Sequence, residues 1–455
     1  MNATPNSIPA WVNRLTIVVM SLMLLYAVVG IPEFNRDVLV ATDNVNPLNR
    51  VIWLGLLGAA APIALVRWRA VLELLASSWA LLLLYAFFAL SVGWALDPDA
   101  SMRRIMFTIV QLLLAAVLLC GLRRASTLHI LIACVCAMAA AEDLVAWALW
   151  PGYAMTDEGL AGLQLQKNQT GLLMMYGCLS ATTGYFLVRG KWLRLMVAGS
   201  VVLMAGLLVA TRSSTSQSIV LMAPVVIPMI LLVSRLPAPA IWAVVAAIPA
   251  AITALFFGYL AWCGVTNYDP WLPLRGVTFT SRLDLWEFAV QEIAKRPWLG
   301  AGYSSFWAIN PAVQPSLKSD MWFGTYAQIN EAHQGYLDLL ATCGVVGLMG
   351  GLFVVFRTLG IAGRAIVRAE PVDAADHAGR MAFPTAVFHM SLLVGLLVHN
   401  FTESNLFSNN SVLAVAFVLA ALDLEKWRLA MRRPVTVRYP NPAPIRGSVP
   451  NAMRI

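Results

Sequence analysis

The hydrophobic positions of this chain form long, nearly continuous runs separated by short polar connections. A membrane-spanning helix needs about 20 predominantly apolar residues, and about twelve runs approach that length. They centre on residues 15–30, 51–66, 74–95, 105–122, 127–149, 170–188, 193–211, 218–234, 239–262, 337–360, 383–402 and 410–427. Because several runs are short or touch one another, the pattern allows eleven to thirteen spans. Most connections are short, so we expect consecutive helices to pack antiparallel.

A long polar interruption separates the ninth and tenth runs. It extends over residues 263–344 and holds charged side chains that the hydrocarbon core of a bilayer would exclude. Within it, Ser281 and Asp284 have the spacing of a helix capping box, and apolar residues recur at helical spacing up to Pro297. A second helix is expected from Asn330 into the tenth span. The interruption predicts a folded loop that covers the outer ends of the helices as a lid.

Composition agrees with an all-α integral membrane protein. The 455 residues are 60% hydrophobic and 12% charged, whereas soluble proteins carry about 25% charged residues. We expect residues 1–262 to hold spans one to nine, 263–336 the outer loop, 337–430 spans ten to twelve, and 431–455 a disordered basic tail. The chain shows no internal repeat of the kind that is common in secondary transporters.

The basic residues are distributed as membrane topology requires. The net charge is +8, and most of the 31 lysines and arginines fall in loops that share one face if the N-terminus is inside. This is the pattern of the positive-inside rule. It predicts that both termini are cytoplasmic and that the loop at 263–344 is outside. The basic excess therefore indicates topology, and we expect no nucleic-acid partner.

Two arginines on the predicted outer face could bind an anion. Arg282 falls in the first turn of the loop helix, where a cation is unfavourable unless an anion lies between it and the helix N-terminus. Arg212 lies in the hydroxyl-rich sequence TRSSTSQS, which includes Ser213 and Ser214. Hydroxyl donors around a fixed arginine suit phosphate oxygens. The alternatives are an ion-paired surface arginine for Arg282 and a polar turn with an anchoring arginine for Arg212.

His333 is the candidate proton acceptor of the long loop. The sequence places it in the first turn of the second helix, where the helix dipole disfavours the imidazolium. A neutral imidazole there could accept a proton, although a hydrogen-bonded structural histidine is the alternative. Lys167 and Asn168 precede the sixth run on the same face, where a lysine can also serve only as an interface anchor. Together these residues suit a substrate with a lipid tail and a phosphate head.

No other grouping along the sequence has the spacing of a metal site. Asp97 and Asp99 superficially resemble the acidic pair that holds a metal in nucleotide-sugar transferases, but they lie in a short outer hairpin, where nucleotide sugars are not expected. Histidines outside the loop, including His129 and His389, are interpreted as structural or cytoplasmic. We therefore expect no metal and no cofactor.

The chain resembles the O-antigen ligase family of Gram-negative bacteria, within the group shared with O-antigen polymerases and pilin oligosaccharyltransferases. The resemblance rests on five segments in the expected order: WALDPDAS, QKNQTG, TRSSTSQS, SRLDLWEFAVQEIAKRPWLGAGYSSF and AHQGYLDLLATCGVVG. The last two are the most specific, and together with the twelve-span layout the resemblance covers roughly residues 15 to 427. The family usually has asparagine where this chain has Gln334.

The resemblance implies a reaction of lipopolysaccharide biosynthesis at the bacterial inner membrane. A glycan on undecaprenyl pyrophosphate would be transferred to a sugar hydroxyl of lipid A–core on the periplasmic side, with inversion and without metal, cofactor or nucleotide. Arg212 and Arg282 would bind the pyrophosphate, and His333 would be the base. Further substrate contacts are expected at Lys167, Asn168, Glu331, Gln334, Ser213 and Ser214.

Several alternatives remain open at this point. An O-antigen polymerase would use a second lipid-linked glycan as acceptor, and a protein O-oligosaccharyltransferase would use a serine or threonine. We favour the ligase because of the chain's size, its single long outer loop and the lack of a large C-terminal outer domain. A flippase or other transporter of lipid-linked sugars would need ionisable residues inside the spans, for which Glu142, Asp143 and Glu403 are the candidates.

Overall fold

The computed structural model describes residues 8–30, 47–164, 166–233, 261–268, 282–325, 329–372, 381–408 and 411–432, with single positions between 236 and 259. Most of the ninth hydrophobic run and Ser281 lie outside these residues. The described chain is mostly helical, with turns and irregular segments between the helices and one two-stranded hairpin of β1 (Met155–Thr156) and β2 (Gly159–Leu160). The all-α architecture expected from the hydrophobic pattern is therefore confirmed.

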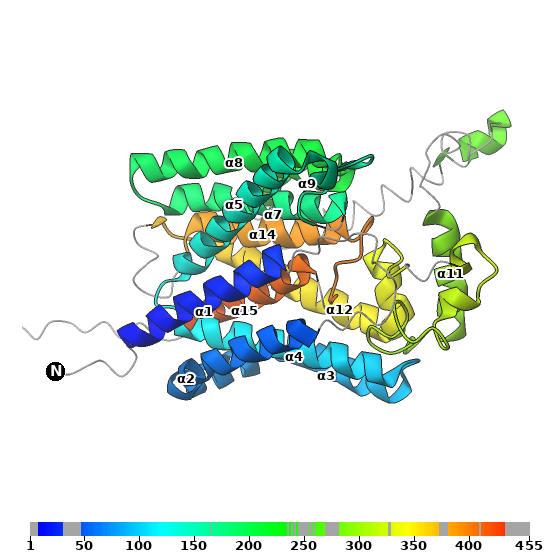
Figure 1. The fold of residues 1–455 in the computed structure, drawn as a ribbon, viewed down its shortest axis with the longest axis horizontal. Coiled ribbons are helices and arrows are strands. Elements are labelled where there is room, and N and C mark those ends of the chain that lie inside the picture. The colour runs from blue at the N-terminus through cyan, green and yellow to red at the C-terminus, as the bar shows by residue number, and fades with distance from the viewer. Residues whose placement is uncertain are drawn as a thin grey trace, which may run out of the picture.

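The long helices lie side by side in one bundle (Figure 1). They are α1 (Ala10–Val29), α2 (Pro47–Ser77), α3 (Trp79–Leu90), α4 (Pro98–Gly121), α5 (Ala125–Leu149), α7 (Lys167–Leu187), α8 (Lys191–Thr211), α9 (Ser214–Val233), α12 (Gly335–Val367), α14 (Phe383–His399) and α15 (Val412–Arg432). Within the described part of the chain, six helices are long and apolar enough to cross a membrane, and two shorter apolar helices accompany them. Multiple membrane spans are thus supported, while the number twelve stays a prediction.

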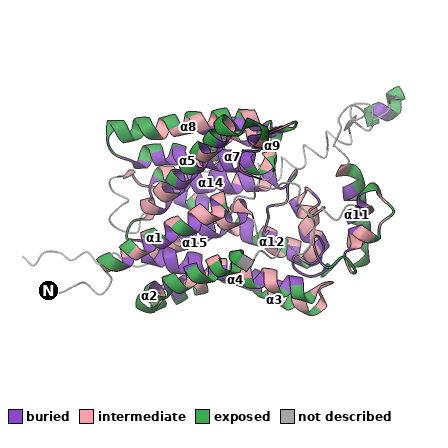
Figure 2. Ribbon diagram, in the orientation of Figure 1, coloured by how far each residue is buried: buried purple, intermediate pink, exposed green. Residues whose placement is uncertain are grey.

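Burial follows what a bilayer requires. The faces that the helices turn toward one another are buried, and their outward faces are exposed (Figure 2). Large apolar side chains populate those exposed faces, among them Leu65, Trp192, Val202 and Leu221. Water would disfavour so much exposed apolar surface, whereas lipid tails accept it. The bundle is therefore built to be surrounded by lipid.

One end of the bundle carries the loop between α9 and α12, and we call it the loop end. The loop contains α11 (Arg282–Lys295) and the short 3-10 helices η4 (Pro315–Lys318) and η5 (Trp322–Thr325). In Figure 1, α11 stands beyond the right-hand ends of the bundle helices. The predicted amphipathic helix is confirmed: α11 buries Leu285, Phe288 and Ala289. It ends before the proline and glycines that the sequence marked as its stop.

The loop has its own small hydrophobic core and is fastened to the bundle. Phe288 packs near Phe306, Trp307 and Phe323. Arg104 of α4 donates to loop carbonyls, including that of Trp307 at 3.1 Å. The indole of Trp307 in turn donates to Asp338 Oδ1 of α12 at 2.6 Å. The loop is therefore held against α4 and α12 by polar as well as apolar contacts.

The second loop helix begins later than the sequence suggested. We expected it from Asn330, but α12 begins at Gly335, with Gln334 as its N-cap accepting from Leu337 N at 2.6 Å. His333 lies outside the helix, with a left-handed φ of 51°. Tertiary contacts explain the difference, because Gln334 N and Gly335 N donate to the segment that follows α14 and not to a preceding helical turn.

A break in α12 joins this helix to the loop. Gly344 has φ 64° and ψ −170°, so the helical hydrogen bonds are interrupted there. The amide nitrogens of Val345 and Val346 donate instead to carbonyls in the segment 297–301, at 2.8 and 3.2 Å. The carbonyl of Ala341 accepts from the same segment at 2.9 Å. The loop therefore completes the backbone hydrogen bonding of α12 where the helix cannot do so itself.

Only glycine fits at this junction. A Cβ on Gly344 would lie 2.3 Å from the backbone of Trp298, and a Cβ on Gly300 would lie 2.5 Å from the backbone of Thr342. Both glycines have positive φ angles, which other L-residues adopt at a cost.

We predict that Gly344→Ala destabilises the protein. The left-handed backbone alone costs about 1–2 kcal/mol for alanine, and the new methyl group must also displace the backbone of Trp298. Thermal unfolding in detergent measures the effect as a lowered Tm. Gly360→Ala is the matched control, because this glycine lies in the same helix with open space around it, and alanine there gains up to about 1 kcal/mol of helix propensity. Equal melting of the two variants would contradict the assigned role of the junction.

Candidate active site

The buried carboxylate of Glu403 brings four segments together at the loop end. Its Oε1 accepts from Asn168 Nδ2 of α7 at 2.9 Å and from Arg282 Nη2 of α11 at 3.2 Å. Its Oε2 lies 3.2 Å from His333 Nδ1. Only 8% of Glu403 is exposed, so these partners replace water around a charge that burial would otherwise disfavour.

The turn between α14 and α15 is built to present this carboxylate. Asn400 Oδ1 accepts from the backbone of Asn405 and Leu406, at 2.9 and 2.8 Å, and thereby closes the turn around its own side chain. Asn400 O accepts from Gly335 N at 2.9 Å. A Cβ on Gly335 would lie 2.0 Å from Asn400 Oδ1, so glycine is required for this approach. The turn and the start of α12 therefore form one unit.

His333 faces two carboxylates through one ring nitrogen. Its Nδ1 lies 2.9 Å from Glu331 Oε1 and 3.2 Å from Glu403 Oε2. Among the described residues, no hydrogen-bond partner faces its Nε2. Carboxylates at Nδ1 favour the tautomer with the proton on that nitrogen, which leaves the Nε2 lone pair as the proton acceptor.

The expected neutral state of His333 is corrected by this environment. Partial burial disfavours the imidazolium, but the hydrogen bonds and negative charges of Glu331 and Glu403 outweigh it and raise the pKa of His333 to about 9. The same pairing lowers the pKa of Glu403 despite its burial. His333 is therefore a stronger base than an ordinary histidine and is mostly protonated at neutral pH.

Arg282 is the first residue of α11, and it is bound to the turn that carries Glu403. Its Nη1 donates to Thr402 O at 2.7 Å and its Nη2 to Glu403 Oε1. The guanidinium, the imidazole and both carboxylates thus lie in one contiguous cluster. Sequence reasoning placed Arg282 and His333 together, and the structure agrees on their proximity through Glu403.

The connection between α8 and α9, which carries Arg212, also contacts the turn between α14 and α15. Thr215 Oγ1 lies 2.8 Å from Thr402 Oγ1. Ser213 is buried and bonded to Ser216, whereas Ser214 is exposed at the start of α9. Arg212 itself is exposed, with a left-handed φ of 53° at the end of α8. Its guanidinium has no hydrogen bond or ion pair with the residues that the structure describes.

The two residues at the start of α7 have different roles. Asn168 is in the cluster through its bond to Glu403. Lys167 instead forms a 3.4 Å ion pair with the exposed Glu158 and is not among the partners of the cluster. This contact fits the interface-anchor interpretation of Lys167.

A polar cavity of about 350 Å³ adjoins Glu403. Its wall combines side-chain amides and hydroxyls, the carboxylates of Glu331 and Glu403, and an apolar part that includes Val28, Leu172 and Leu173. The amide and hydroxyl residues are Gln164, Gln166, Asn168, Gln169, Asn330, Ser404, Asn405, Ser408 and Ser411. Such groups both donate and accept hydrogen bonds, as a sugar's hydroxyl groups require.

Two acidic groupings bear on metal binding at this end. The ligand atoms of Glu331, His333 and Glu403 lie within 4.8 Å of one another, close enough to hold an ion. However, the Arg282 guanidinium already forms an ion pair with the Glu403 carboxylate, and its positive charge would repel a metal cation there. Asp97 has a structural role, because its carboxylate caps α4 through Ala100 N at 2.9 Å and accepts from Asn310 N at 3.0 Å.

Sequence reasoning missed the central role of Glu403. It noted this residue only as an ionisable group that could serve transport. The available signal was the polar run NFTESN, which interrupts the apolar C-terminal third of the chain. Asp143 of α5 was noted for the same reason. Its carboxylate accepts a hydrogen bond from Leu163 N, in the segment before α7, at 2.8 Å.

The bundle carries charged and polar side chains together at its loop end. Residues 199–351, about a third of the chain, match the model of the family described as O-antigen ligase. The matched segment includes Arg212, Arg282 and His333, whereas Asn168 and Glu403 lie outside it. A comparison with curated proteins gave no significant match.

We predict that His333 titrates near pH 9 in the free protein. Diethyl pyrocarbonate modifies the neutral imidazole, so its rate of reaction with His333, followed by mass spectrometry of the loop peptide, should be half-maximal at about pH 9. Glu331→Gln should move this midpoint to lower pH, because one stabilising carboxylate is lost. Glu158→Gln is the control and should leave it in place, since Glu158 pairs with Lys167. A midpoint near the ordinary value of 6.5 would refute the assigned environment.

Proposed function

We propose that this protein is an O-antigen ligase of the bacterial inner membrane. It transfers glycan from undecaprenyl pyrophosphate to a sugar hydroxyl of lipid A–core in lipopolysaccharide biosynthesis. The loop end faces the periplasm, and both termini are cytoplasmic. The observation that carries the proposal is the Glu403 cluster, which joins Arg282, His333 and the Arg212 hairpin at one end of an apolar bundle.

The arginines bind the pyrophosphate of the donor. Arg212 is exposed at the end of α8, and the exposed Ser214 adds a hydroxyl donor beside it. Arg282 is bonded to the carbonyl of Thr402 and to Glu403, and phosphate oxygens can compete with Glu403 for its guanidinium. Negative charge accumulates on the pyrophosphate as the glycosidic bond breaks, so these cations stabilise the transition state more than the ground state.

His333 accepts the proton of the attacking hydroxyl. Its Nδ1 is held by Glu331 and Glu403, so Nε2 is the reacting atom, as in other carboxylate–histidine pairs. The hydroxyl attacks the anomeric carbon from the side opposite the pyrophosphate, which inverts the configuration there. The proton goes to Nε2, and the electron pair of the broken bond leaves with the pyrophosphate.

The polar cavity beside Glu403 holds sugar rings next to the reacting centre. Its amide and hydroxyl lining suits carbohydrate hydroxyl groups, and Asn168, Glu331 and Gln334 are positioned by the same cluster. No metal ion is needed at this site, because two arginines and a protonatable histidine supply positive charge where the phosphate requires it.

The proposal is tested by reconstitution in liposomes with an undecaprenyl-pyrophosphate-linked glycan. Three acceptors are offered separately: lipid A–core, a second lipid-linked glycan, and a peptide with serine and threonine. We expect a covalent, inverted product on lipid A–core, at a rate that EDTA leaves unchanged. Product on the lipid-linked glycan would show a polymerase, product on the peptide a protein transferase, and donor movement without product a transporter.

Variants link this activity to the cluster. Arg282→Ala should reduce transfer by about 10²–10³-fold, the usual loss when one transition-state donor is removed. Lys295→Ala, at the other end of α11, is the matched control and should retain activity, because Lys295 pairs only with Glu292 on the surface. Similar losses in both variants would show that α11 matters only for folding.

The pH dependence of transfer should identify the base. If Nε2 of His333 accepts the proton, kcat/KM rises about tenfold per pH unit below the pKa of about 9. Glu331→Gln should shift this rising limb to lower pH, and His333→Ala should lose about 10²–10⁴-fold and the limb itself. Full activity of His333→Ala, or a rate that is flat from about pH 6 to about pH 9, would show that a different group is the base.

A further inference from the structure

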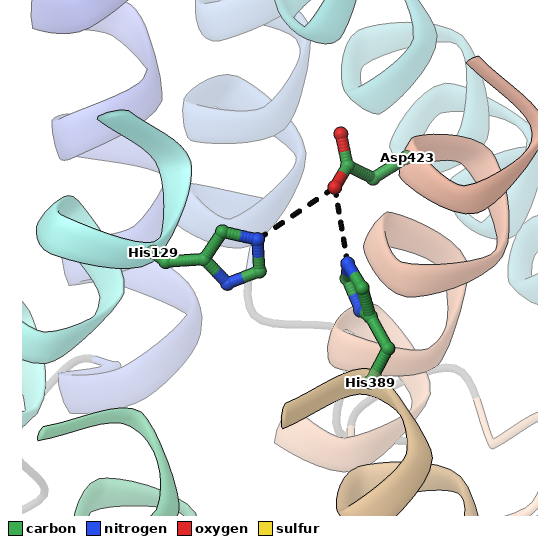
Figure 3. Close-up of side chains that lie close together, drawn as sticks. All are labelled: His129, His389 and Asp423. Atoms are coloured by element: carbon green, nitrogen blue, oxygen red, sulfur yellow. Dashed lines mark hydrogen bonds and ion pairs between the residues drawn. The ribbon is translucent and has the colours of Figure 1, made fainter. Parts of the chain in front are cut away.

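A second cluster of ionisable side chains lies inside the bundle, away from the loop end. His129 of α5, His389 of α14 and Asp423 of α15 point toward one another from three helices (Figure 3). All three residues are at most 3% exposed. Buried ionisable groups are costly in a membrane protein and are retained where they have a partner or a task.

The partners within the described chain are insufficient for this cluster. His389 Nε2 lies 3.0 Å from Asp423 Oδ2, which is a hydrogen bond. His129 Nε2 lies 3.6 Å from the same oxygen, which is too far for one. Both ring nitrogens of His129 and Nδ1 of His389 are buried without a hydrogen-bond partner. Leaving such buried polar groups unpaired is unfavourable.

Two separations between these atoms are close to the edge of a metal coordination sphere. Tetrahedral zinc with nitrogen and oxygen ligands at about 2.0–2.1 Å has ligand atoms about 3.3 Å apart. The two measured separations, 3.0 and 3.6 Å, lie on either side of that value, and the ligand atoms of all three residues lie within 4.8 Å of one another. Two imidazoles and one carboxylate are also a familiar zinc ligand set.

One cation, Lys426, lies near the cluster and interacts with the charge of Asp423 without forming an ion pair with it. Lys426, one turn further along α15, donates to Leu119 O of α4 and forms no ion pair with Asp423. The aromatic ring of Phe388 covers His129 edge-on at 5.2 Å. A carboxylate in such surroundings is strongly stabilised by a cation that it contacts directly.

We propose that His129, His389 and Asp423 bind one divalent transition-metal ion, zinc in the first place, through two Nε2 atoms and Oδ2. The ion cross-links α5, α14 and α15 at a point remote from the Glu403 cluster. α14 and α15 are the two helices that flank the Glu403 turn, so the ion stabilises the support of that turn without taking part in transfer.

Metal analysis of the purified full-length protein tests the proposal. The protein in detergent is first stripped of metal with a chelator and then incubated with a small excess of zinc. After unbound metal is removed, the zinc content per chain is measured by elemental mass spectrometry. We expect close to one zinc per chain in the unsubstituted protein and a large loss in His129→Gln and Asp423→Asn. His333→Gln is the matched control and should retain zinc, which separates this cluster from Glu331, His333 and Glu403.

X-ray absorption of the zinc-loaded unsubstituted protein gives a result that does not depend on the folding of any variant. Nitrogen and oxygen neighbours at about 2.0–2.1 Å support the site, whereas a sulfur neighbour at about 2.3 Å would assign the metal to a cysteine. Zinc should also raise the Tm of the unsubstituted protein and not that of His129→Gln. The proposal is overturned if the unsubstituted protein retains no zinc, or if retention follows His333 and not His129.

Discussion

The negative charge of Glu403 is the constraint around which the loop end is organised. A carboxylate this deeply buried must be compensated, and the chain supplies an amide from α7, a guanidinium from α11 and an imidazole from the segment before α12. These elements are distant in sequence, with 121 residues separating Arg282 from Glu403 and 235 separating Asn168 from it. Removing the charge would leave Arg282 with only the Thr402 carbonyl and His333 with only Glu331 among the partners described above, so Glu403 contributes to both the geometry and the electrostatics of the site.

That arrangement has a chemical consequence for the histidine. The same carboxylates that orient His333 raise its pKa to about 9, so orientation and basicity cannot be adjusted independently. A neutral histidine would be ready to accept a proton at pH 7 but would be a weaker base. Here the imidazole is a stronger base that is neutral only part of the time, and its cationic form adds to the positive potential that a phosphate group would encounter.

The hydrophobic pattern predicted the long helices well because both lipid and the protein core favour long apolar runs. The loop helix α11 was predicted from apolar residues at helical spacing and from the proline and glycines that follow it. Gln334 and Gly335 were predicted as helix interior, yet their amides bond to Ser404 and Asn400, and no local pattern contains that information. Glu403 and the histidine–aspartate cluster were missed for the same reason. His129, His389 and Asp423 occur in three separate apolar runs, and only packing shows that they meet.

The junction at Gly344 restricts how far the adjoining part of the loop can move. Segment 297–301 shares three backbone hydrogen bonds with α12 at its break, through Val345, Val346 and Ala341. Moving this segment away from α12 would break all three bonds together, and each is worth about 0.5–1.5 kcal/mol. Under the proposed function, a lipid-linked donor therefore has to reach the Glu403 cluster while this part of the loop stays in place.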